Sequence, residues 1–210
     1  MKRAGLLFSV LAISLMLGIA SGNALAQNVG DNSVYFVTYY SNALTAGAPA
    51  ATLRLINDGD KSTTETEGIP NGNLWASIYV FDDSQEFQEC CSCLVTPDGL
   101  LSENVNTELL ANSLTGKANT RGVIKVVSSS TNPGDPTNNT LAPGLRGWET
   151  HIQRAAAGAA LVDFAITETP LADSNLSATE KVVLQELCSF SITLGSGRGT
   201  CTCTPEDQDF

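Results

Sequence analysis

The amino-acid sequence predicts a mainly β protein, with β-sandwich-like antiparallel sheets and one C-terminal helix. Segments rich in β-branched and aromatic residues recur along the chain, and such residues favour strands. Clusters of Gly, Pro, Asn and Asp separate these segments at spacings of about 8 to 15 residues, which is typical of an all-β sandwich. A single segment, near the C-terminus, combines helical periodicity with a capping signal.

Length and composition narrow the class of protein. A chain of 210 residues suits one globular domain. Hydrophobic residues make up 42% and charged residues 16%, so the sequence does not resemble a charge-rich disordered chain. The formal charge of -11 predicts no nucleic-acid partner, because contact with phosphates needs a basic surface.

The first residues have the three parts of an export signal. Lys2 and Arg3 form a positive region, residues 6–20 form an apolar region, and Ala24-Leu25-Ala26 supplies small residues for cleavage. About fifteen apolar residues cover roughly 22 Å as a helix, which is less than the roughly 30 Å of a bilayer core. We therefore expect residues 1–26 to be a cleaved signal peptide rather than a membrane span.

Residues 27–210 are expected to form a single β-rich domain in which residues 195–210 are a disulfide-tethered tail. Both methionines, Met1 and Met16, lie in the expected signal, and a chain without thioethers suits an oxidising setting. The sequence thus predicts a secreted or periplasmic protein.

The expected strands differ in how many of their faces are apolar. Residues 51–56 alternate apolar and polar side chains, which fits a strand with one face in water. Residues 74–81 are apolar on both faces and should lie centrally in the core. The full set of expected strands is 34–40, 51–56, 74–81, 87–95, 100–105, 122–127, 148–153 and 160–167.

Two hairpins are expected. Residues 96–99 read Thr-Pro-Asp-Gly, and in such a turn Pro presets φ and Gly accepts a positive φ. This turn should join 87–95 to 100–105 as a hairpin. Residues 148–153 and 160–167 should form the second, although the Ala-rich stretch 153–161 leaves a helical turn as an alternative. The Pro-, Gly- and Asn-rich stretch 128–147 should be a long surface loop.

The helix is expected over residues 178–190. Ser177 and Glu180 have the spacing of a capping box, and glycines at 195, 197 and 199 should end the segment. The apolar stripe of this helix should contain Val183, Leu184, Leu187 and Cys188.

Six cysteines fall into two groups, Cys90, Cys91 and Cys93, and Cys188, Cys201 and Cys203. An even number of cysteines in an exported chain favours disulfides. On a strand, Cys91 and Cys93 point to one face and Cys90 to the other, and neighbouring cysteines rarely bond to each other. We therefore expect three bridges between the groups: Cys90 to Cys188, and Cys91 and Cys93 to Cys201 and Cys203 in an order left open.

Other chemistries are weaker alternatives. A zinc or copper(I) thiolate site would use the same six cysteines, but their spacing differs from the usual C-x-x-C pair. No G-x-S-x-G pentapeptide occurs, and the one histidine, His151, beside Glu149 and Trp148, is expected to be packed rather than catalytic. A carboxylate-dependent hydrolase would draw on Asp82, Asp83, Glu86 and Glu89.

Four further features have structural readings that outweigh their functional ones. Residues 57–60 (Asn-Asp-Gly-Asp) could bind Ca²⁺ but read first as a turn. The glycine-rich stretch 195–199 lacks a phosphate-loop lysine, and the terminal Phe210 follows an acidic, Pro-containing stretch that is not a barrel strand. A sugar-stacking platform could use Tyr35, Tyr39, Tyr40, Trp75, Tyr79 and Trp148, although strand aromatics usually lie in a core.

The sequence thus predicts an exported, non-catalytic, disulfide-stabilised protein without a cofactor. Its role would be structural, adhesive or ligand-binding, with an envelope or extracellular protein or glycan as partner. A secreted hydrolase and a thiolate metal-binding protein are the alternatives.

Overall fold

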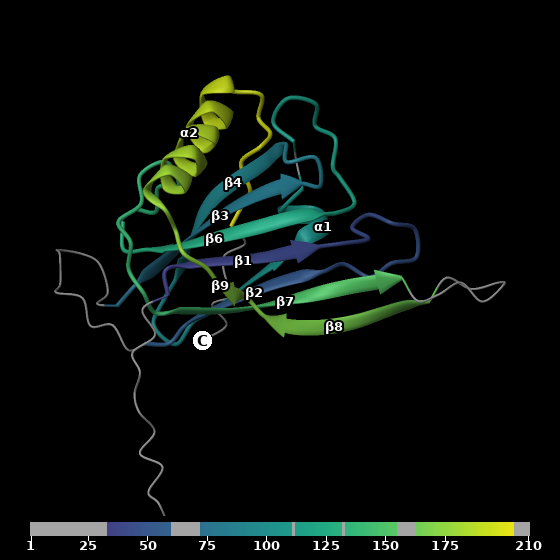
Figure 1. Ribbon diagram of the computed structural model, residues 1–210, viewed down its shortest axis with the longest axis horizontal. Coiled ribbons are helices and arrows are strands. Elements are labelled where there is room, and N and C mark those ends of the chain that lie inside the picture. The colour runs from purple at the N-terminus through teal and green to yellow at the C-terminus, as the bar shows by residue number, and fades with distance from the viewer. Residues whose placement is uncertain (1–32, 60–71, 111, 132, 155–162, 204–210) are drawn as a thin grey trace, which may run out of the picture. The chain divides into compact units, whose positions relative to one another are not determined.

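The computed structural model describes residues 33–59, 72–110, 112–131, 133–154 and 163–203 (Figure 1). The expected signal peptide, residues 155–161 of the Ala-rich stretch 153–161, and Phe210 lie outside the described residues. Among the described residues, no helix is both long and apolar enough to cross a membrane.

Two antiparallel sheets make up the fold, which confirms the expected class. The first sheet has the strand order β4-β3-β6-β1-β9 and the second has the order β5-β2-β7-β8. The strands are β1 (Tyr35–Tyr40), β2 (Thr52–Asn57), β3 (Leu74–Asp82), β4 (Phe87–Val95), β5 (Leu100–Asn104), β6 (Gly122–Ser129), β7 (Leu145–Arg154), β8 (Phe164–Pro170) and β9 (Ala172–Asp173), and the helices are α1 (Val105–Glu108) and α2 (Ala178–Leu194).

Apolar side chains gather in two layers. The larger cluster lies between the sheets and takes Leu53 and Leu55 from β2 together with Ile78 and Val80 from β3. The smaller cluster joins Tyr79 and Cys90 of the first sheet to α2. Strand β3 is therefore covered on both faces, as its apolar pattern predicts, whereas β2 alternates between buried and partly exposed residues.

The turn at residues 96–99 does not close a hairpin. Strand β4 pairs with β3, and β5 pairs with β2 in the other sheet. The Asp98 amide donates to the Asn57 carbonyl, and the Asn57 amide donates to the Gly99 carbonyl, so the turn is bound to the end of β2. Asp98, at φ 60°, rather than Gly99, has the positive φ. The chain changes sheets at this turn, and the expected hairpin is wrong.

The second hairpin is present. Strands β7 and β8 pair in antiparallel register, with His151 opposite Thr167. Strand β7 begins at Leu145 rather than at Trp148, because residues 145–147 pair with β2.

Helix α2 has half of the expected capping box. The Ser177 hydroxyl accepts from the Glu180 amide at 3.0 Å. The Glu180 carboxylate instead accepts from Lys125 Nζ and from the Tyr35 hydroxyl, which lie on the strands below the helix. The helix continues to Leu194 and ends at Gly195, which has a left-handed conformation. Leu184 and Cys188 are buried, but Val183 is 41% exposed.

Candidate functional site

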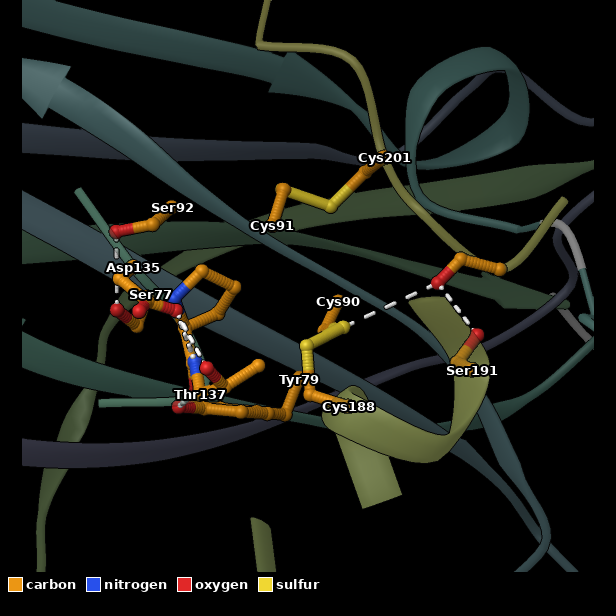
Figure 2. Close-up of a disulfide and its surroundings, with 12 residues drawn as sticks. Ser77, Tyr79, Cys90, Cys91, Ser92, Asp135, Thr137, Cys188, Ser191 and Cys201 are labelled. Atoms are coloured by element: carbon orange, nitrogen blue, oxygen red, sulfur yellow. Dashed lines mark hydrogen bonds between the residues drawn. A yellow bond between two sulfur atoms is a disulfide. The ribbon is translucent and has the colours of Figure 1, made fainter. Parts of the chain in front are cut away.

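The three disulfides all join one cysteine group to the other. Cys90 is bonded to Cys188, Cys91 to Cys201, and Cys93 to Cys203, with Cα separations of 5.8, 5.1 and 5.3 Å. Figure 2 shows that the first bridge reaches the helix while the second reaches the tail. These pairings follow the strand geometry, because Cys90 faces the helix layer and its neighbour Cys91 faces the layer between the sheets.

The tail runs beside β4 as an added parallel segment. Cys90 and Thr200 form a parallel bridge. The Cys90 amide donates to the Gly199 carbonyl, and the Cys201 amide donates to the Cys90 carbonyl, each at 3.1 Å. Both tail disulfides span the same sequence separation of 110 residues. The tail therefore covers the outer edge of β4 around Cys90. The equal sequence separations mean that the register between the tail and β4 is the same at both disulfides.

The sulfur atoms of the two tail bridges lie close together. Cys91 Sγ and Cys93 Sγ are 3.7 Å apart, and the Sγ atoms of Cys91, Cys93 and Cys203 all lie within 4.8 Å of one another. Zinc and copper(I) bind thiolates, and all six cysteines, each of them described, are in disulfides. The spacing of these sulfurs would suit a soft metal ion only after reduction.

A buried polar network fastens the loop after β6 to the helix-side face of β3. The Ser77 hydroxyl donates to Asn139 Oδ1, the Asn139 amide donates to the Tyr79 hydroxyl, and that hydroxyl donates to the Pro136 carbonyl. Burial raises the pKa of Tyr79 to about 12, so its hydroxyl stays neutral. Figure 2 shows Tyr79 beside the Cys90–Cys188 bridge. The network holds this loop in place with hydrogen bonds.

His151 is a buried link between three strands. Its Nδ1 donates to the Tyr39 carbonyl at 2.9 Å, so in the neutral ring Nε2 accepts from the Thr169 hydroxyl at 2.7 Å. The ring stacks on Tyr39 with a centroid separation of 4.1 Å. Burial lowers the pKa of His151 and favours the neutral ring. Both ring nitrogens are thus occupied within the fold.

Replacing His151 with Ala is expected to lower the free energy of unfolding by about 1–3 kcal/mol, because two hydrogen bonds and a buried ring are lost. Urea unfolding of the variant measures this change. Thr169→Val, which removes only the Nε2 partner, should cost less than His151→Ala. Equal stability of His151→Ala and wild type would contradict the linking role.

Glu149 is a buried carboxyl group in the interior of the fold, on β7. Its side chain is fully buried, and neither carboxyl oxygen has a hydrogen-bond partner. Its neighbours on the two flanking strands are Leu53 and Thr169, and burial raises the pKa of Glu149 to about 8. The sequence places Glu149 beside His151 but gives no sign that it points into the interior.

The four carboxylates of the hydrolase alternative lie in and around the turn between β3 and β4. Asp82 accepts from the amides of Ser84 and Glu86, each at 2.8 Å, and from the side chains of Gln88 and Asn119. Asp83 pairs with Arg121, and Glu86 accepts from the Asn112 side chain. Glu89 is buried on β4. The Asp82 carboxylate thus stabilises the turn between β3 and β4 through hydrogen bonds.

The turn and glycine motifs also have structural partners. The Asn57 side chain donates to the carbonyls of Gly72 and Val95 and accepts from the Gly59 amide. Asp58 pairs with Arg146 at 3.3 Å, and Asp60 lies outside the described residues. Gly195, Gly197 and Gly199 all have a positive φ, which ends the helix and turns the chain toward β4.

The six aromatic residues do not share one surface. Tyr35, Tyr40 and Tyr79 are buried in two different clusters, whereas Tyr39 is 47% exposed. Trp75 and Trp148 are partly buried on strands of different sheets. The alternative of a sugar-stacking platform on these six residues is therefore not assembled, and the buried tyrosines agree with the core reading.

Comparison with protein families, with curated proteins and with solved structures finds no match to this chain.

Proposed function

We propose that the chain is an exported, disulfide-stabilised binding protein with a structural or adhesive role in the cell envelope or outside the cell, and that it binds a partner by strand addition along β8. The observation that supports this proposal is the outer edge of β8. The strand has seven residues, and every residue from Ala165 to Pro170 is exposed.

The other sheet edges offer less backbone to a partner. The tail covers β4 around Cys90, β9 has two residues, and β5 has five. Among the described residues, β8 pairs only with β7. An uncovered strand edge presents amide and carbonyl groups to which an extended peptide can bind.

The register shows which groups face outward. The Leu171 amide donates to the Gly147 carbonyl, next to the pair Trp148–Pro170. Hydrogen-bonded pairs alternate along an antiparallel ladder, so Ala165, Thr167 and Thr169 direct their backbone groups toward β7. Ile166 and Glu168 then direct theirs outward, and Pro170, which has no amide proton, occupies the next outward position.

The net negative charge of the chain favours a basic partner over a second copy of the same chain. Each copy carries a formal charge of -11, so two copies repel each other. The outward positions add the 59% exposed Ile166, together with Glu168, whose carboxylate is paired with Arg54 on the neighbouring part of the sheet. The matching partner is an extended, basic segment with apolar residues on the alternate positions.

A synthetic peptide with the sequence Lys-Val-Thr-Val-Lys-Val-Thr tests this proposal. It should shift the amide NMR signals of Ile166 and Glu168 and slow their hydrogen exchange. The same peptide with Glu in place of Lys should bind more weakly. Ile166→Pro removes an outward amide and should abolish the effect, whereas Leu114→Pro, in an exposed loop, should not.

Three results would refute strand addition along β8. These are signal changes confined to other strands, equal binding by the Ile166→Pro variant, and no change with either peptide. A dimer in analytical ultracentrifugation that Ile166→Pro dissociates would identify a second copy as the occupant and overturn the choice of partner.

A further inference from the structure

We propose that the two tail bridges form a redox site for a dithiol reductant, in which one two-electron reduction releases both tail cysteines and leaves a new bond between Cys91 and Cys93. The inference is independent of the binding proposed for β8. It rests on the 3.7 Å contact between the Sγ atoms of Cys91 and Cys93 and on the unequal burial of the six cysteines.

The entry point is Cys203. Five cysteines are buried, with exposed fractions from 0% to 7%, and Cys203 alone is partly exposed. Thiol–disulfide exchange begins when a thiolate reaches a sulfur atom of the bridge. An external dithiol therefore attacks Cys203 Sγ first, and the bond to Cys93 breaks with Cys93 as the leaving thiolate.

The released thiolate lies next to a second disulfide. Cys93 Sγ is fully buried and is 3.8 Å from Glu103 Oε1, and a negative sulfur beside a buried carboxyl group is costly. Cys91 Sγ is already in contact with it. Attack on that atom forms the Cys91–Cys93 bond, breaks the Cys91–Cys201 bond and transfers the negative charge to the tail.

Formation of the new bond requires β4 to bend locally. Cys91 and Cys93 point to the same face of β4, but alternate residues of an extended strand are about 6.6 Å apart, and a disulfide needs about 3.5–4.5 Å between its Cβ atoms. The exchange step therefore includes a local shortening of β4 between these two residues. The first thiol of the reductant is by then bonded to Cys203 as a mixed disulfide. Its second thiol attacks this bond, which closes the reductant to a disulfide and releases Cys203. Two electrons and two protons pass from the dithiol, and the protons end on Cys201 and Cys203.

Loss of both bonds would leave the tail with few anchors. Backbone hydrogen bonds between Cys90 and the tail remain, together with the bond that the Ser191 hydroxyl donates to the Gly199 carbonyl. Departure of the tail would expose the edge of β4 that it covers. The Cys90–Cys188 bridge, with both residues fully buried, stays closed and retains α2.

Stepwise reduction with dithiothreitol tests the site. Aliquots are alkylated and mapped by mass spectrometry without further reduction. The first reduced species should carry label on Cys201 and Cys203 and contain a Cys91–Cys93 bond. A double variant, Cys91→Ser with Cys201→Ser, lacks the internal acceptor and should carry label on Cys93 and Cys203 instead.

The positions of the label in the wild-type protein test the proposal even if the double variant does not fold. Label on Cys93 and Cys203 with the Cys91–Cys201 bond intact would show reduction without exchange. Early label on Cys90 and Cys188, or simultaneous label on all six cysteines, would show that the tail bridges are not the preferred target. Each of these results overturns the inference.

Discussion

Glu149→Gln is expected to stabilise the protein strongly at alkaline pH and to leave its stability almost unchanged below about pH 4.5. Burial raises the pKa of Glu149 from 4.5 to about 8 in the folded protein. The carboxyl group is therefore neutral in the folded state over a range in which the unfolded chain ionises. Glutamine has nearly the same shape and never ionises, so it removes the difference between the two states.

The direction in which stability changes with pH follows from proton linkage. Between pH 4.5 and about 8 the folded state binds a proton that the unfolded state has lost, so stability falls as the pH rises through this range. At about 1.4 kcal/mol per pKa unit, the loss above pH 8 amounts to roughly 5 kcal/mol. Burial of His151 has the opposite sign, since its lowered pKa reduces stability as the pH falls below 6.5.

Urea unfolding at a series of pH values measures the effect. The difference between Glu149→Gln and wild type should grow steadily from acid to alkaline pH, and comparison at each pH cancels the His151 contribution. Glu186→Gln, at an exposed position on α2, is the control for loss of a surface carboxyl group. A Glu149→Gln protein whose stability runs parallel to that of wild type would show that Glu149 is not buried and neutral.

Removal of the Cys90–Cys188 bridge should have the second large effect. The Cys90→Ala, Cys188→Ala double variant removes this bond while the neighbouring Cys91–Cys201 bond still joins the two regions, so the covalent ring that opens contains only about 15 residues. Loop-closure entropy for about 15 residues is worth about 3 kcal/mol, which is a substantial part of the 5–15 kcal/mol that typically stabilises a domain. Helix α2 should also loosen, because its buried residues are Leu184, Cys188 and Ser191 alone.

Hydrogen exchange distinguishes the loss of overall stability from the loosening of α2. In the double variant the α2 amides should exchange faster, whereas a matched Cys91→Ala, Cys201→Ala variant should keep α2 protected and lose less overall stability. The Cys91–Cys201 bond is not made by an α2 residue, and the Cys93–Cys203 bond two residues away still closes nearly the same loop. Unchanged α2 exchange in the first variant would mean that packing and the Glu180 contacts suffice to hold the helix.

The sequence predicts local features of this fold better than long-range ones. The alternation of β2 and the two-sided apolar pattern of β3 depend on period-two periodicity, which is visible in the chain itself. The turn at 96–99 is visible too, but its partner is Asn57 on another strand, and no local pattern specifies that contact. Glu180 was expected to cap its own helix, and Lys125 and Tyr35 bind it instead because β1 and β6 lie below.

The candidate site, too, was predictable from the sequence only where it depends on local strand geometry. Alternation along β4 separates Cys90 from Cys91 and Cys93, so the bridge to the helix could be assigned from the sequence. The order of the tail bridges depends on whether the tail runs parallel or antiparallel to β4, and the sequence does not specify that direction. The interior position of Glu149 depends on its pairing with Leu53 across two strands, which sequence periodicity cannot reveal.

The tail bridges also determine how the domain transmits a pulling force. Tension applied between residue 33 and residue 203 would pass from β4 directly into the tail through the disulfides, because a covalent path is shorter than the backbone path. Only the chain up to β4 could then extend, to roughly 200 Å at about 3.4 Å per residue. Strands β5 to β8 and helix α2 lie within the closed loop, so the disulfides exclude these segments from extension along the chain. An anchored molecule of this kind would lengthen under strain by a limited amount.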